Sequence, residues 1–232
     1  MEIYWTSILK AFTLIIELDN DLIEILLLSF KVTSVALFFS CIIGLPVGTF
    51  LATQRFRGRT ILIGIINAFM ALPPVVVGLF VYINFSRSGP FGWLGILYTP
   101  TAMIIAQIIL ILPIISGLTF QIIEDIQERY EELFLSLVLS KFQIIKAYII
   151  DARYSLTTVI LAGFAKGISE VGAVIIVGGN IDHLTRVITT TIAMETSKGE
   201  LSLALALGIL LLIISIVINL LVTYKKYSYR DR

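Results

Sequence analysis

Five long apolar stretches dominate this sequence and limit what it can fold into. They cover residues 22–52, 61–85, 100–123, 154–179 and 201–224. A helix needs about 20 apolar residues to cross the hydrocarbon core of a bilayer. A helix also satisfies its own backbone hydrogen bonds without water. The sequence therefore predicts an all-α fold, a polytopic transmembrane helix bundle of about five spans.

The composition argues against a water-soluble domain. Of the 232 residues, 58% are hydrophobic and only 14% are charged, whereas about a quarter of an ordinary soluble domain is charged. The net charge of +1 gives no reason to expect a nucleic-acid partner. Because no long linker or fixed-period repeat stands out, we predict one domain over residues 1–232, with its membrane-spanning core at 22–224.

Residues 3–18 carry apolar side chains at helical spacing, but the segment is too short to cross a bilayer comfortably. We predict an amphipathic helix in the membrane interface; a sixth span is the alternative. The segment starts with Glu2 rather than a basic stretch and has no small-residue cleavage site, so it does not resemble a cleaved signal peptide.

Basic residues in the loops predict the orientation, because they collect on the cytoplasmic side. One side carries eleven: Arg55, Arg57, Arg59, Arg129, Lys141, Lys146, Arg153, Lys225, Lys226, Arg230 and Arg232. The other side carries four: Lys10, Arg87, Arg186 and Lys198. We therefore expect a multi-pass protein of the plasma (inner) membrane, with its N-terminus outside and its C-terminus in the cytoplasm.

The inner segment 124–152 is acidic at its start and then apolar. Apolar residues beside Glu131 and Glu132 in a cytoplasmic helix suit insertion into a groove of a partner protein. The alternative is an amphipathic helix that rests on the membrane or on its own bundle.

This segment, Glu131-Glu132-Leu133-Phe134-Leu135-Ser136-Leu137-Val138-Leu139-Ser140, resembles the EAA loop of type I ABC importer permeases. Glu132-Leu133-Phe134 takes the place of Glu-Ala-Ala, and Val138 takes the place of the glycine. The family's two alanines, its glycine and its later proline are absent here. The resemblance implies coupling helices that sit in a cleft of an ATPase subunit, with Glu131, Glu132, Leu133, Phe134, Leu137 and Val138 at the contact.

Two further blocks are similar to the oxyanion branch of the same family, most of all to tungstate permeases and their molybdate and sulfate relatives. They are Leu72-Pro73-Pro74-Val75-Val76-Val77-Gly78-Leu79 and the stretch from Gly167 to Asn180. The resemblance implies four partners: a cytoplasmic ABC ATPase dimer, an extracytoplasmic oxyanion-binding protein, a second copy of this chain and the bilayer. No cofactor is expected in the chain itself, since no phosphate-binding loop occurs in it and ATP would be bound by the partner.

Charged and helix-breaking residues inside the spans mark a candidate translocation path. Lys166 and Glu170 are four residues apart in one predicted helix, so they could pair on one face. Ionisable groups at membrane depth are usually functional, although a structural ion pair is the alternative. We predict a path or gate at Pro73, Pro74, Pro113, Lys166, Ser169, Glu170, Gly172 and Asn180; for the prolines, plain structural kinks are the alternative.

Small residues and hydroxyls complete the pattern. Gly44 and Gly48, and Gly163 and Gly167, have the four-residue spacing that lets helices approach closely. The outer segment 182–199 is rich in threonine and serine, which suits an outer gate or a docking surface for a binding protein, or equally a solvated loop. With one cysteine and one histidine, His183, a soft-ligand metal site has too few ligands.

The sequence thus predicts the membrane-spanning permease subunit of an ATP-driven oxyanion importer, with tungstate as the expected ion. Such a chain has no catalytic residue of its own, because its partner hydrolyses ATP. Two alternatives use the same residues differently. One is a secondary transporter or channel in which Lys166 and Glu170 relay an ion, and the other is a membrane scaffold that transports nothing.

Overall fold

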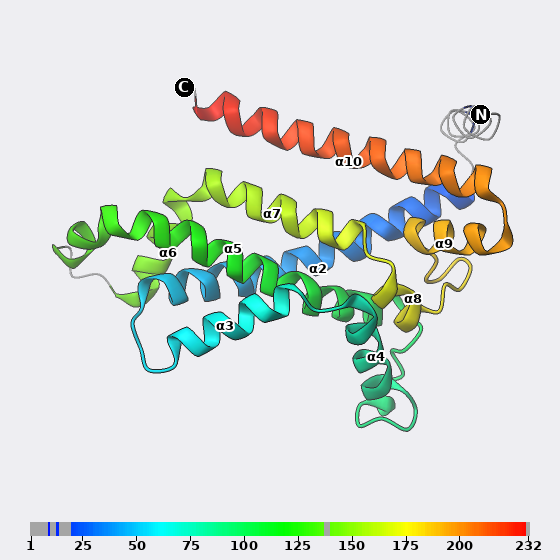
Figure 1. Cartoon of the computed structure of the whole chain (residues 1–232), viewed down its shortest axis with the longest axis horizontal. Coiled ribbons are helices and arrows are strands. Elements are labelled where there is room, and N and C mark those ends of the chain that lie inside the picture. The colour runs from blue at the N-terminus through cyan, green and yellow to red at the C-terminus, as the bar shows by residue number, and fades with distance from the viewer. Residues whose placement is uncertain (1–8, 10–12, 14–19, 137–139, 231–232) are drawn as a thin grey trace. The chain divides into compact units, whose positions relative to one another are not determined.

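The computed structural model describes residues 9, 13, 20–136 and 140–230 of the chain (Figure 1). Most of the predicted interfacial helix at 3–18 lies outside these residues. The described residues form helices and no strand, which confirms the all-α class. The elements are α2 (Asn20–Thr53), α3 (Arg59–Met70), α4 (Pro74–Phe85), the short 3-10 helix η1 (Gly92–Leu94), α5 (Pro100–Ser136), α6 (Lys141–Asp151), α7 (Arg153–Ile168), α8 (Gly172–Gly178), α9 (Ile188–Lys198) and α10 (Leu201–Arg230).

Three of the five predicted spans are confirmed, and the other two are interrupted. Among the described residues, α2, α5 and α10 are long and apolar enough to cross a membrane. Two further spans result if α3 with α4, and α7 with α8, are each counted as one interrupted span. Three of the five apolar stretches thus correspond to uninterrupted spans, while the second and the fourth are each broken and form either an interrupted span or a re-entrant loop.

The break in the second span follows from the chemistry of proline. Proline disfavours a helical conformation in the residue before it and has no N–H for the helix ladder. Helix α3 ends at Met70, and the N–H of Ala71 closes it by donating to the carbonyl of Ala68 at 3.1 Å. Pro74 is the first residue of α4. A backbone N–H at this position has no carbonyl partner within the helix, so a proline there costs no hydrogen bond.

The break in the fourth span corrects a prediction. Helix α7 ends at Ile168 and α8 begins at Gly172, so Lys166 and Glu170 do not lie on one face of one helix. Lys166 is in the last turn of α7, whereas Glu170 is in the non-helical connection. The sequence contains no proline here that would have indicated this break.

The chain divides into two compact units, each assembled from separate stretches. The first contains residues 1–35, 74–107 and 168–232. Within it α4 packs on α8, and α9 lies beside α10 (Figure 1). Leu22, Ile188, Leu207 and Leu210 form its apolar core around α9 and α10. The single domain predicted over 1–232 stays a prediction.

Backbones come very close where α4 meets α8. A Cβ added at Gly78 would lie only 2.8 Å from the Cα of Ala173. A Cβ added at Gly172 would lie 2.9 Å from Cγ2 of Val75. Glycine is required at Gly78 because the opposing atoms belong to backbone and cannot move aside as a side-chain end could.

The second unit contains residues 36–73 and 108–167. Here the predicted small-residue spacing corresponds to real contacts. A Cβ at Gly44 would lie 2.8 Å from Ile115, one at Gly163 would lie 2.7 Å from the same side chain, and one at Gly48 would overlap the carbonyl of Ser116. The end of α2 and the middle of α7 therefore both approach α5 closely.

Arg59 connects three elements of the second unit at the end of α2. Its Nε donates to the carbonyl of Leu51 at 2.7 Å, and its guanidinium pairs with Glu124 at 2.9 Å. The guanidinium carbon also lies 5.3 Å from the ring centre of Phe120. The arginine thus satisfies a helix-terminal carbonyl that has no partner within its own helix.

Candidate functional site

Glu170 is the best-defined polar group of the interrupted fourth span. Its side chain is 5% exposed, and its Oε1 accepts a hydrogen bond from the N–H of Ala173 at 3.1 Å. A carboxylate in this place suits the positive end of a helix. The carbonyl of Glu170 accepts a second bond, from the hydroxyl of Thr189 at 2.8 Å. Glu170 therefore holds the connection between α7 and α8 against the first turn of α9.

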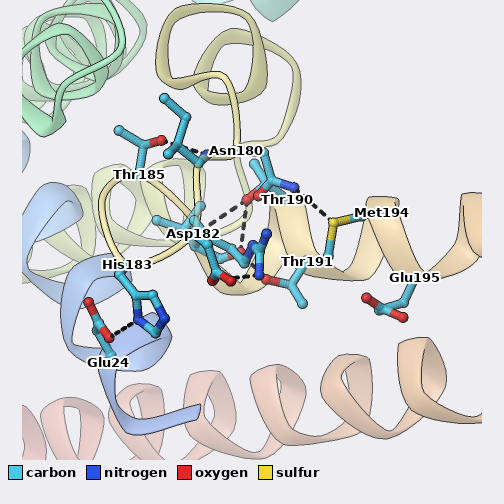
Figure 2. Close-up of polar contacts among 12 residues, drawn as sticks. Glu24, Asn180, Asp182, His183, Thr185, Thr190, Thr191, Met194 and Glu195 are labelled. Atoms are coloured by element: carbon cyan, nitrogen blue, oxygen red, sulfur yellow. Dashed lines mark hydrogen bonds and ion pairs between the residues drawn. The ribbon is translucent and has the colours of Figure 1, made fainter. Parts of the chain in front are cut away.

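The threonines that follow are buried, which contradicts the alternative of a solvated loop for this part of segment 182–199. Thr185, Thr189, Thr190 and Thr191 are all buried, whereas Thr196 and Ser197 are exposed. The Thr185 hydroxyl donates to the Gly178 carbonyl at 2.6 Å, and those of Thr190 and Thr191 both donate to the Val187 carbonyl (Figure 2). Buried hydroxyls need such partners, so these threonines fix the turn between α8 and α9.

Asn180 stands in a strained turn at the end of α8. Gly179 and Asn180 both have positive φ, +72° and +50°, a region that glycine and asparagine tolerate best. The amide of Asn180 donates to the Met194 sulfur at 3.4 Å (Figure 2). Its Oδ1 is buried without a hydrogen-bond partner in the described part of the chain, and so is Nε of Arg186. Oδ1 of Asn180 can therefore accept a hydrogen bond, and Nε of Arg186 can donate one.

A histidine contact in the same loop was not predicted. Nδ1 of His183 lies 2.8 Å from Oε2 of Glu24, at the start of α2 (Figure 2). The hydrogen bond with Glu24 raises the pKa of His183, and the charges of Asp182 and Glu24 raise it further. No local pattern could have indicated this pair, because 159 positions separate the two residues.

The remaining predicted path residues fall in both units. In the second unit, Pro73 is exposed between α3 and α4, Pro113 is buried inside an uninterrupted α5, and Lys166 is half-buried. In the first unit, Ser169 is exposed in the break after α7. Gly172 and Pro74 are neighbours there, because a Cβ on Gly172 would lie 3.6 Å from Cβ of Pro74. Their joint role as a path stays a prediction.

The predicted coupling segment begins inside a transmembrane helix. Glu131, Glu132, Leu133 and Phe134 belong to the end of α5, which runs without interruption from Pro100, while Leu137 and Val138 lie outside the described residues. Helix α6 then starts behind Ser140. The Ser140 hydroxyl accepts from the N–H of Gln143, and the Gln143 side chain accepts from the Ser140 N–H, which is a capping box. Helix α5 therefore ends at Ser136, and helix α6 begins at Lys141.

Three apolar helices and two bent helix pairs of membrane-spanning composition are typical of a multi-pass membrane protein. The chain belongs to the family of binding-protein-dependent transport system inner membrane components, whose pattern it matches over residues 44–226. It is therefore an inner-membrane permease and not itself an enzyme, as predicted. Membership also implies association with a binding protein and an ATPase.

Individual relatives are consistent with this family. The chain is 41% identical over 209 residues to the tungstate uptake system permease protein TupB of Peptoclostridium acidaminophilum, covering 90% of this chain and 92% of that protein. It is 35% identical to a probable anion ABC transporter permease protein of Haloferax volcanii, with 91% of each chain covered. A sulfate transport system permease protein, CysT of Escherichia coli, is 27% identical, with 82% and 73% covered. None of these relatives favours a secondary transporter or a scaffold.

Proposed function

We propose that this chain is the permease subunit of an ATP-driven importer of an oxyanion, and that the oxyanion is tungstate. The observation that carries the proposal is the 41% identity to a tungstate permease along nearly the whole length of both proteins. A second tungstate permease, from Campylobacter jejuni, is 37% identical over 161 residues. Sulfate and molybdenum permeases are more distant, at 23–27% identity.

The proposed assembly contains two copies of the chain, because oligomers of identical subunits usually have two-fold symmetry. A cytoplasmic ABC ATPase dimer binds the ends of α5 near Glu132, and an extracytoplasmic binding protein delivers the anion. The N-terminus lies outside and the C-terminus lies in the cytoplasm. The excess of basic residues at 55–59, 141–153 and 225–232 supports this orientation.

The proposed path uses the interrupted helices. A helix break at membrane depth leaves backbone groups without helical partners, and such breaks are tolerated where they line a cavity or are buried in protein. The connections at 71–73 and 169–171 are of this kind. Glu170 acts as a positioning residue, since its carboxylate and carbonyl already hold α8 and α9. Lys166, Ser169 and Asn180 supply polar groups along the proposed path, while Pro73, Pro74, Pro113 and Gly172 shape it.

Reconstituted uptake tests the proposal. The chain, its ATPase and its binding protein are placed in proteoliposomes, and labelled tungstate is followed with and without ATP. We expect uptake only with ATP, and we expect Glu132→Arg to abolish it without affecting insertion. Reversing the charge at the proposed ATPase contact opposes docking, because like charges at an interface repel.

Asp125→Arg is the matched control. Asp125 is an exposed carboxylate on the same helix but outside the proposed contact, and its variant should transport normally. Normal uptake by Glu132→Arg, or uptake that follows the proton gradient instead of ATP, would contradict the proposed coupling.

A further inference from the structure

The loop after α4 encloses a cavity that the proposed path does not use. Its volume is about 640 Å³, and all of its lining residues belong to the first unit. They are Tyr82, Phe85, Ser86, Arg87, Ser88, Gly92, Gly95, Leu97 and Tyr98. In the proposed orientation this loop faces the extracytoplasmic side. Ligand pockets typically have volumes of this order.

The chemistry of the lining is suited to an anion. Its lining residues include one arginine, Arg87, together with two tyrosines and two serines. The lining residues include no Asp or Glu, and the sequence has none from residue 25 to residue 123. A guanidinium presents several N–H donors in a fork that matches the geometry of oxyanions. Hydroxyl groups donate to the remaining oxygens.

Tyr98 is held in the cavity wall at a conformational cost. Its φ is +61°, which is unusual for a bulky residue and marks strain that the surroundings must enforce. Its N–H donates to the carbonyl of Val177 at 2.9 Å. Its ring lies against Gly179, where a Cβ would come within 2.8 Å of it. Helix α8 therefore fixes the position of the Tyr98 side chain.

The two tyrosine rings meet edge to face, with their centres 6.3 Å apart. A hydrogen bond with Tyr82 raises the pKa of the Tyr98 hydroxyl, and burial raises it further. Across the loop, Oγ of Ser86 and Oγ of Ser88 are 3.3 Å apart, so these hydroxyls are also grouped.

Two glycines make the loop a fixed wall. The Gly89 N–H donates to the carbonyl of Ser86 at 2.8 Å, and the Gly92 N–H donates to that of Gly89 at 3.1 Å. A Cβ at Gly89 would overlap the carbonyl of Ile83, and one at Gly92 would overlap that of Ser86. The loop folds back onto the end of α4 so tightly that only glycine fits at these positions. The Arg87 segment is therefore preorganised.

We propose that this cavity is a low-affinity site for a tetrahedral oxyanion at the outer mouth of the permease, with Arg87 as its charged ligand. The inference rests on the proposed function, and it adds an entry site to it. The cavity is larger than a single oxyanion, so a bound ion retains part of its hydration. Weak and partly hydrated binding suits a site that receives an ion and then passes it on.

Direct binding tests the site. The permease–ATPase complex in lipid nanodiscs, without binding protein, is dialysed to equilibrium against labelled tungstate. We expect Arg87→Gln to weaken this binding about tenfold or more, because charge-assisted hydrogen bonds are lost. Arg87→Lys keeps the charge but loses the forked donors, so its binding should lie between that of the wild type and that of Arg87→Gln. Tyr98→Phe keeps the ring on Gly179 and loses only the hydroxyl, so a smaller decrease is expected.

Unchanged tungstate binding by Arg87→Gln, in a complex that elutes and melts as the wild type does, would overturn the proposal. The proposal would also be overturned if Arg87→Gln left tungstate binding intact and instead weakened docking of the binding protein, whether loaded or empty. In that case Arg87 would contact a carboxylate of the partner. ATP-driven uptake by the wild type tests the proposed function separately, since a complex can bind the ion at this cavity without transporting it.

Discussion

At the scale of single residues, Gly78 shows how little space separates α4 from α8. Its missing Cβ would lie 2.8 Å from the Cα and 3.1 Å from the carbonyl oxygen of Ala173. Gly78→Ala must therefore push two backbones apart. Overpacking of this kind typically costs about 1–3 kcal/mol. We expect a corresponding decrease in the thermal stability of the purified protein in detergent.

Gly208→Ala is the matched control for this substitution. Gly208 is inside α10 of the same unit, and no atom lies within 4 Å of the position of its missing Cβ. Alanine is the better helix former by up to about 1 kcal/mol, so stability should stay the same or rise. If Gly78→Ala and Gly208→Ala lowered the thermal stability equally, the close approach of α4 and α8 at Gly78 would not explain the effect.

At the scale of elements, the start of α6 depends on one serine. Ser140 and Gln143 form reciprocal hydrogen bonds between their side chains and backbone N–H groups. Ser140→Ala removes the cap and should destabilise the first turn by about 1 kcal/mol. Faster hydrogen exchange of the amides at 142–145 would report the loss. Ser140→Asp retains a capping oxygen and should exchange as the wild type does; equal exchange in all three proteins would rule out the cap.

The contact between His183, in the loop between α8 and α9, and Glu24 of α2 should depend on pH. The hydrogen bond with Glu24 raises the pKa of His183 above its ordinary value of 6.5. The stabilisation is therefore complete below about pH 6.5, and it is lost as the pH rises through the higher pKa of the folded state. Because His183 is the only histidine, thermal unfolding measured between pH 6 and pH 8.5 should reveal its titration.

His183→Gln should remove this pH dependence and leave the unfolding temperature nearly constant over the same range. Glu24→Gln should also remove this pH dependence, because it replaces the negatively charged partner of His183 with a neutral side chain. A pH dependence that survives both substitutions would come from another group and would contradict this role of the pair.

Much of the element pattern could be predicted, because it follows from local chemistry. The length of each apolar stretch gives a span, and Pro73-Pro74 indicates a break from the geometry of proline alone. The contacts at Gly44, Gly48 and Gly163 follow from small residues at helical spacing.

The rest depends on residues far apart in the sequence. The break after α7 has no proline, and the carbonyl of Glu170 is held by Thr189, 19 positions later. The Ile188 N–H at the start of α9 donates to the hydroxyl of Ser29, 159 positions earlier. Because such partners are supplied by the folded chain, the pattern of the segment itself left open an outer gate, a docking surface and a solvated loop.

At the scale of the whole molecule, the two units are interleaved along the chain. Helices α2 and α5 run without a break through the points where the chain passes from one unit to the other, at 35/36 and 107/108. The other two passages, at 73/74 and 167/168, fall within or next to the helix breaks. The units are thus joined by two continuous helices and two interrupted ones.

The orientation of the whole chain can be tested with one cysteine at a time, because Cys41 is the only native one. In a Cys41→Ser background, Ser197→Cys places a thiol at an exposed position after the fourth span, and Asp151→Cys places one at an exposed position before it. The basic residues around 141–153 should keep that segment in the cytoplasm. A membrane-impermeant maleimide should therefore label Ser197→Cys in intact cells, and Asp151→Cys only after permeabilisation. The reverse pattern would invert the orientation and place the loop with Arg87 inside the cell, where it could not receive an imported anion.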